Sequence, residues 1–127
     1  MKSVVFLLVF SIFYMSCGNA QITKDIQSTE VSEKIKTDKS ILILDVRTPG
    51  EFSAGHIEGA INIDANGTEI YSNIDKLDKN KTYIVYCRTK NRSGVVVNYM
   101  QNNGFKDVYK MVDGFSGWTI NNLPFVR

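Results

Sequence analysis

The sequence predicts an α/β domain in which a central parallel β-sheet carries helices on both faces. Short apolar runs alternate along the chain with segments whose apolar residues recur at helical spacing. Residues 41–46 form an apolar run without alternation, which is typical of a strand buried on both faces. The chain has 127 residues, of which 43% are hydrophobic, so it can form one compact domain with a core but not two domains.

Each predicted element has a local reason. The strands are short apolar runs, and the helices carry apolar residues three or four positions apart. Ser28 is a suitable N-cap for the first helix, and Asn103-Gly104 is a suitable end for the fourth. The expected strands cover residues 25–27, 41–46, 60–63, 83–86 and 108–111. The expected helices cover residues 28–36, 51–54, 68–77, 93–102 and 113–118.

Residues 1–20 are predicted to be an export signal, and the domain is predicted to cover residues 21–127. A positive charge at Lys2 precedes an apolar run over residues 4–15, which is too short to span a bilayer. The small residues that follow allow cleavage either before Cys17 or after Ala20. Ser16-Cys17 resembles the box of a bacterial lipoprotein, and we prefer this interpretation because Cys17 is otherwise unexplained. The protein is therefore expected in the periplasm, anchored to an envelope membrane by a lipid on Cys17.

The cysteine count points to a reactive thiol. The chain has two cysteines, and one of them lies in the predicted export signal. Cys87 then has no intramolecular partner, and an unpaired cysteine in an exported protein suggests a free reactive thiol or an intermolecular disulfide. The cationic side chains at Arg88, Lys90 and Arg92 argue against an inert cysteine buried in apolar surroundings.

Cys87 is placed where parallel sheets bind ligands. It follows the strand at residues 83–86 and precedes a polar loop that opens onto a helix. Loop amides and the helix dipole favour an anion there, and the thiolate of Cys87 is the nearest one. Asp45 and Met111 are expected at the carboxyl ends of other strands of the same sheet, so three segments should gather around one site.

Several function classes are excluded by composition. The formal net charge is only +2 with interspersed signs, so no nucleic-acid surface is expected. His56 is the only histidine, which excludes a histidine-rich metal site, and we expect neither a metal nor a cofactor. No Cys-x-x-Cys pair exists, so a dithiol oxidoreductase is disfavoured. A mixed disulfide between Cys87 and a partner's thiol stays open, and membrane contact is expected only through the signal or lipid anchor.

Three segments together resemble the single-domain rhodanese-like family of sulfurtransferases. Residues 44–63 (LDVRTPGEFSAGHIEGAINI) resemble its front motif, and residues 86–93 (YCRTKNRS) resemble its active-site loop. Residues 113–118 (DGFSGW), with Leu123-Pro124 beyond, resemble its C-terminal motif. The resemblance implies a parallel α/β fold and a persulfide on Cys87. Sulfur would come from a small donor such as thiosulfate or a polysulfide and pass to cyanide or a thiol.

The resemblance also implies roles for individual residues. Backbone amides of the loop would stabilise the thiolate and the persulfide. Arg92 would stabilise an anionic donor, Arg88 would help to dock it, and Asp45 and Arg47 would brace the loop. Glu51 is a candidate partner for Arg47 across the turn. The residues expected to bind the substrate are Arg88, Thr89, Lys90, Asn91, Arg92 and Ser93.

The sequence departs from the family pattern at two positions. Lys90 stands where the loop usually has glycine, so it must either adopt a positive φ or bend the loop differently. Asn122 stands where a glycine often precedes the Leu-Pro pair, and asparagine tolerates the left-handed conformation.

Two other function classes compete with sulfur transfer. Cysteine phosphatases and arsenate reductases place an arginine six positions after the cysteine, whereas this position holds Ser93, and Arg92 comes one residue earlier. The shorter loop makes a smaller cradle, which suits one sulfur atom better than a tetrahedral oxyanion. The other alternative is a rhodanese fold that only docks a partner or carries sulfur passively.

Overall fold

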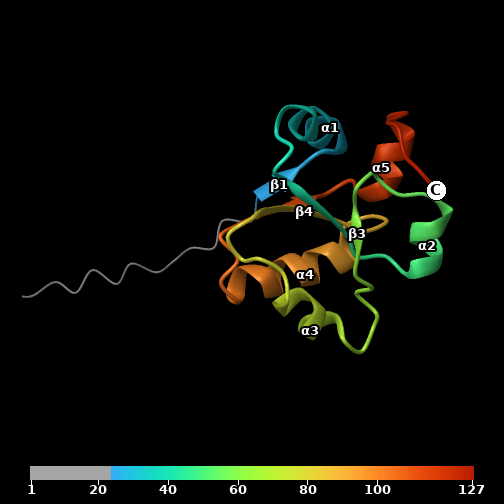
Figure 1. Cartoon of the computed structure of the whole chain (residues 1–127). Coiled ribbons are helices and arrows are strands. Elements are labelled where there is room, and N and C mark those ends of the chain that lie inside the picture. The colour runs from blue at the N-terminus through green and yellow to red at the C-terminus, as the bar shows by residue number, and fades with distance from the viewer. Residues whose placement is uncertain (1–23) are drawn as a thin grey trace, which may run out of the picture.

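The computed structural model describes residues 24–127. The predicted export signal, the cleavage alternatives and Cys17 therefore lie outside the described residues. The described chain forms a five-stranded parallel sheet with strand order β1-β5-β4-β2-β3 and helices on both faces (Figure 1). The predicted fold class is confirmed. No helix within residues 24–127 is long and apolar enough to cross a bilayer.

All ten predicted elements are present, most with ends shifted by one or two residues. The strands are β1 (Lys24–Ile26), β2 (Leu42–Asp45), β3 (Ile61–Asn62), β4 (Thr82–Tyr86) and β5 (Asp107–Met111). The helices are α1 (Ser28–Thr37), α2 (Pro49–Ala54), α3 (Ile70–Asp75), α4 (Asn91–Asn102) and α5 (Gly114–Ile120).

The sheet separates two apolar clusters. Helices α1 and α5 cover one face, and α3 and α4 cover the other (Figure 1). Side chains of β4 alternate between them: Tyr83 and Val85 join the cluster under α4, whereas Ile84 and Tyr86 join the cluster under α1 and α5. The central strands are thus buried on both faces, as the apolar runs predicted.

Parallel register brings the strand ends together. Asp45 at the end of β2 lies opposite Tyr86 at the end of β4, and the Val46 amide donates to the Tyr86 carbonyl at 2.9 Å. Strand β5 pairs with the other side of β4. Beyond α5 the chain returns to the end of α2, where His56 and Val126 exchange two backbone hydrogen bonds of 2.9 Å.

Helix starts depart from the predictions for identifiable reasons. The N-cap of α1 is Gln27, not Ser28, because the amide and hydroxyl of Ser28 donate to the Asp113 carboxylate at 2.9 and 2.5 Å. This long-range acceptor takes Ser28 into the helix as its first residue. Helix α4 begins at Asn91, two residues earlier than predicted, because Lys90 takes the N-cap position.

The two departures from the family pattern have different outcomes. Asn122 adopts φ 54°, the left-handed conformation that asparagine was expected to tolerate. Lys90 instead has φ −143° and ψ −11°, so the loop bends without a positive φ at this position. A positive φ occurs further on at Gly114, which has φ 61° and no room for a side chain against the loop backbone.

We predict that Gly114→Ala destabilises the fold by about 2 kcal/mol or more, because a strained φ adds to steric overlap. A Cβ at Gly114 would overlap the carbonyl oxygens of Arg88 and Thr89. Gly94, in the interior of α4, is the matched control, because a Cβ there meets no atom within 4 Å apart from its own helix backbone and chain neighbours. Gly94→Ala should stabilise the protein by about 0.5–1 kcal/mol. Urea unfolding of both variants measures the difference, and equal stabilities would contradict the prediction.

Candidate active site

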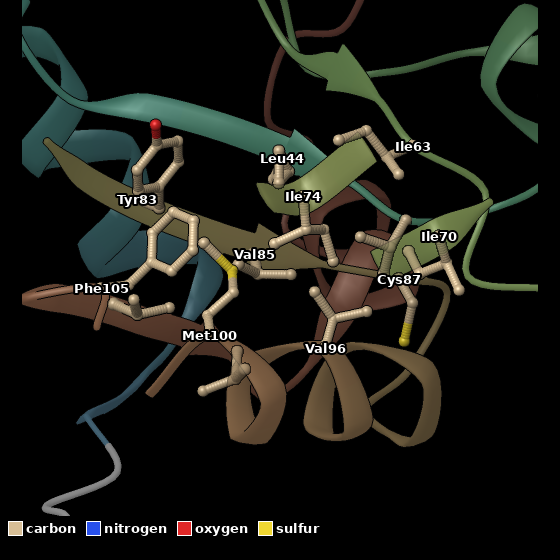
Figure 2. Packing of buried hydrophobic residues seen from close by; sticks show 13 residues of the cluster. Leu44, Ile63, Ile70, Ile74, Tyr83, Val85, Cys87, Val96, Met100 and Phe105 are labelled. Atoms are coloured by element: carbon tan, nitrogen blue, oxygen red, sulfur yellow. The ribbon is translucent and has the colours of Figure 1, made fainter. Parts of the chain in front are cut away.

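Cys87 is the first residue beyond β4 and turns toward α4. Figure 2 shows it at one end of the apolar cluster, beside Ile70 and Val96. Only 1% of the residue is exposed, so the burial that we argued against does occur. The surroundings are not wholly apolar, however, because the thiol donates a hydrogen bond to Ser93 Oγ at 3.4 Å. Ser93 is itself fully buried and donates to the Lys90 carbonyl at 3.2 Å.

The segment after Cys87 is shorter than a six-residue loop. Only Arg88, Thr89 and Lys90 lie between Cys87 and α4, and their side chains are exposed. Asn91, which is also exposed, begins the helix, so Arg92 and Ser93 belong to its first turn. First-turn amides have no carbonyl partner within their own helix, and the helix dipole favours negative charge near them. The N-terminal end of α4, which favours negative charge, thus points toward the sulfur of Cys87.

The loop is supported from behind by α5. The Cys87 carbonyl accepts from the Phe115 amide at 2.9 Å, and the Arg88 carbonyl accepts from the Ser116 amide at 3.0 Å. Close approach of the two segments requires the missing side chain at Gly114. These backbone contacts fix where Cys87 and Arg88 stand relative to α5.

A buried ion pair lies beside the loop. Arg47 Nη2 lies 2.7 Å from Asp45 Oδ2, and Nε adds bonds of 3.0 and 3.1 Å to the two carboxylate oxygens. The same Nη2 donates to the Gly55 carbonyl at 2.6 Å, and the guanidinium lies 4.2 Å from the centre of the Phe115 ring. Burial would lower the pKa of Arg47, but the hydrogen bonds and charge of Asp45 outweigh it and raise that pKa. The pair joins β2, the end of α2 and α5.

Glu51 binds Arg92 and not Arg47, contrary to the pairing considered from the sequence. Arg92 Nη1 and Nη2 donate to the two Glu51 oxygens at 2.6 and 3.1 Å. Arg47 is held by Asp45 instead. The hydrogen bond from Arg92 is the main cause that lowers the pKa of Glu51 to about 2, and the same bond raises the pKa of Arg92. An anionic donor must therefore compete with Glu51 for this guanidinium.

This contact joins residues 41 positions apart, so the sequence alone did not identify it. A local signal did exist for the orientation of Glu51. Thr48 and Glu51 form a capping box at the start of α2, in which the Thr48 amide donates to Glu51 at 3.3 Å. This capping fixes Glu51 on the first turn of α2, and a T-x-x-E pattern predicts it.

A groove of about 340 Å³ opens next to the loop. Its lining residues are Arg47, Glu51, Ala54, Gly55, Arg88, Phe115, Ser116 and Thr119. Cys87 is not part of the lining, so the sulfur does not form the groove floor. Within residues 24–127, neither Arg88 nor Lys90 has an ion-pair partner. Arg88 lines the groove and Lys90 is exposed two residues further along, so both carry uncompensated positive charge on this segment.

Other groups have no evident part in the site. His56 stacks on Phe52 with ring centroids 3.7 Å apart, and its Nδ1 lies 2.9 Å from the Phe52 carbonyl oxygen. Among the described residues, no group of three or more histidine, cysteine and acidic side chains is arranged to hold a metal ion. A larger hollow of about 510 Å³ lies elsewhere, between the end of α1, the start of β2 and the C-terminal tail.

Comparison with known proteins gives consistent matches. A family profile described as the rhodanese-like domain matches residues 27–121. Over 95 residues the chain is 34% identical to a thiosulfate sulfurtransferase, GlpE, of Coxiella burnetii. The alignment covers 75% of this chain and 86% of that protein. YrkF of Bacillus subtilis, provisionally named a sulfur carrier protein, is 31% identical over 82% of this chain, which spans only 55% of its length.

A solved structure supports the same grouping. The crystal structure of a rhodanese-related protein from Thermoplasma volcanium superposes with a TM-score of 0.73 and 29% sequence identity. The superposition covers 81% of this chain and 97% of that one.

We predict that acid weakens the fold through the Glu51–Arg92 pair. A carboxylate with a lowered pKa stabilises the folded state above its ordinary pKa of 4.5, and this stabilisation is lost as the pH falls toward 2. Because both side chains are partly exposed, the loss should be about 1 kcal/mol. The measurement is the free energy of unfolding at pH 6, 4 and 2.5 for wild type and Glu51→Gln. Their difference should shrink over this range, and a constant difference would contradict the prediction.

Proposed function

Because the chain belongs to the rhodanese-like domain family, we propose that it is a sulfurtransferase, which moves a sulfane sulfur atom to a thiophilic acceptor through a persulfide on Cys87. The observation that carries the proposal is the position of this thiol. Cys87 is the only cysteine in residues 24–127, and it lies between the carboxyl end of β4 and the start of α4. That position supplies both a nucleophile and an environment for its anion.

The proposed reaction has two displacement steps. The Cys87 thiolate attacks the outer sulfur of a donor such as thiosulfate or a polysulfide. A bond forms between the two sulfurs, the S–S bond of the donor breaks, and its electron pair leaves with the inner group, which is sulfite for thiosulfate. A second nucleophile, cyanide or a thiol, then attacks the outer sulfur of the persulfide and restores the Cys87 thiolate.

Ser93 is suited to support both charged states of the site. Its hydroxyl accepts from the protonated thiol, and a hydroxyl can rotate to donate to a thiolate or to a persulfide. Ser93 is fully buried, so this hydrogen bond does not compete with bulk water. Because Cys87 is 1% exposed, the donor reaches the sulfur only when residues around it move.

The charges at the mouth favour an anionic donor. Arg88 lines the groove and has no ion-pair partner in the described chain, and Lys90 lies two residues further along the exposed segment. We assign the first contact with the donor to Arg88. Thr89 and Asn91 complete the exposed rim and can offer hydrogen bonds there.

A passive sulfur carrier is the alternative, and the provisional name of YrkF is the reason to test it. An enzyme would turn over many donor molecules, whereas a carrier would load one sulfur atom and wait for a partner protein's thiol. We also propose that the domain works outside the cytoplasm, attached to an envelope membrane through a lipid on Cys17.

Incubation with thiosulfate or polysulfide is predicted to add one sulfur atom to the intact protein, and Cys87→Ser should abolish the gain because it removes the nucleophile. Intact-protein mass spectrometry measures the gain. Adding cyanide should return the original mass and release thiocyanate. An enzyme should repeat this cycle many times, whereas a carrier should release thiocyanate only once per loading. Absence of any mass gain from either donor would refute the proposal.

Expression in a bacterium supplied with labelled palmitate is predicted to label the protein and to place it in the membrane fraction. Cys17→Ser should lose the label, because the thiol is the acceptor for the lipid, while Cys87→Ser keeps it. A mature protein that begins after Ala20 and carries no label would instead establish simple secretion.

A further inference from the structure

We propose that Glu51 sets the donor specificity of the Cys87 site by withholding Arg92, so that the site selects organic persulfides over dianionic thiosulfate. The inference rests on the proposed sulfur transfer at Cys87 and names the class of donor. Glu51 acts here as a specificity-determining residue, since it touches neither the reacting thiol nor its hydrogen-bond partner.

The first argument is that two of the three arginines near the strand ends, Arg47 and Arg92, are already paired. Both terminal nitrogens of Arg92 bind the two oxygens of Glu51. The two nitrogens that could otherwise hold an oxyanion donor are therefore occupied by a carboxylate. Arg47 is buried, and its Nε and Nη2 bind the Asp45 carboxylate. A donor that depends on two or more free arginines near the thiol does not find them.

The second argument is the composition of the groove. Glu51 and Arg88 both line it, so an incoming anion meets a fixed negative charge as well as a positive one. Phe115 and Ala54 contribute apolar surface to the same walls. A donor with an apolar organic body and at most one charge on its reacting group fits this lining better than a small dianion.

The corresponding transfer is balanced without any further reactant. The Cys87 thiolate attacks the outer sulfur of R–S–SH, a new S–S bond forms, and the bond between the two donor sulfurs breaks. The products are the Cys87 persulfide, which keeps the proton of the outer sulfur, and the thiolate R–S⁻, which keeps the electron pair. The sulfane sulfur is transferred from the donor to Cys87 without net oxidation or reduction.

The test compares two donors, thiosulfate and benzyl persulfide, in single-turnover loading of Cys87 followed by intact mass. Glu51→Gln keeps an acceptor for the Thr48 amide but frees Arg92 from its charge partner. It should raise the loading rate from thiosulfate about tenfold, and change that from benzyl persulfide by less than about twofold. Salt should also slow thiosulfate loading more steeply in this variant than in wild type.

Two further variants make the test decisive. Arg92→Gln breaks the same ion pair but leaves Glu51 negative, so thiosulfate loading should fall while benzyl persulfide loading changes less. Glu58→Gln, at an exposed position outside the groove, makes the same change in net charge and should leave the donor preference as in wild type.

The outcomes separate this inference from the proposed function. If Glu51→Gln and Arg92→Gln slow both donors alike, the ion pair only holds the fold and the inference is overturned. It is also overturned if Glu51→Gln lowers the preference for thiosulfate. If wild type loads sulfur from neither donor, the proposed function itself fails. Opposite shifts in the two variants, confined to thiosulfate, would establish Glu51 as the specificity determinant.

Discussion

The buried pair of Asp45 and Arg47 is the contact on which the rest of the site depends. Charges this far from water are tolerated only when hydrogen bonds satisfy them, and here the carboxylate, the Gly55 carbonyl and the aromatic face of Phe115 do so together. Each of these partners comes from a different segment. The pair therefore fixes the end of β2, the turn after α2 and the start of α5 relative to one another.

Placement of the thiol follows from that framework. Once α5 is fixed, the amides of Phe115 and Ser116 hold the carbonyls of Cys87 and Arg88, and the bare backbone at Gly114 allows the two segments to touch. The front motif contributes a second link through Glu51, which reaches the first turn of α4. Two motifs that are remote in sequence thus hold the short segment that joins β4 to α4 and carries Cys87.

Much of this arrangement could be predicted from the sequence, and the rest depends on long-range choices. Apolar runs identified the central strands, and the family pattern, which often has glycine at position 122, pointed to the left-handed conformation that Asn122 adopts. The partner of Arg92 could not be predicted in this way. It depends on which acidic side chain the fold brings close to Arg92, and local spacing does not decide that. The N-cap of α1 was misjudged for the same reason, since the Asp113 carboxylate that takes up Ser28 lies 85 residues away.

The burial of Cys87 also bears on how long the thiol survives. Oxidation to sulfenic and then sulfinic acid requires that a peroxide reach the sulfur. With 1% of the residue exposed, a peroxide and a sulfur donor both need the residues around the sulfur to move before they can reach it. Resistance to oxidation and the rate of sulfur loading therefore depend on the same local opening. Any change that speeds loading by making this opening easier also shortens the chemical lifetime of the nucleophile.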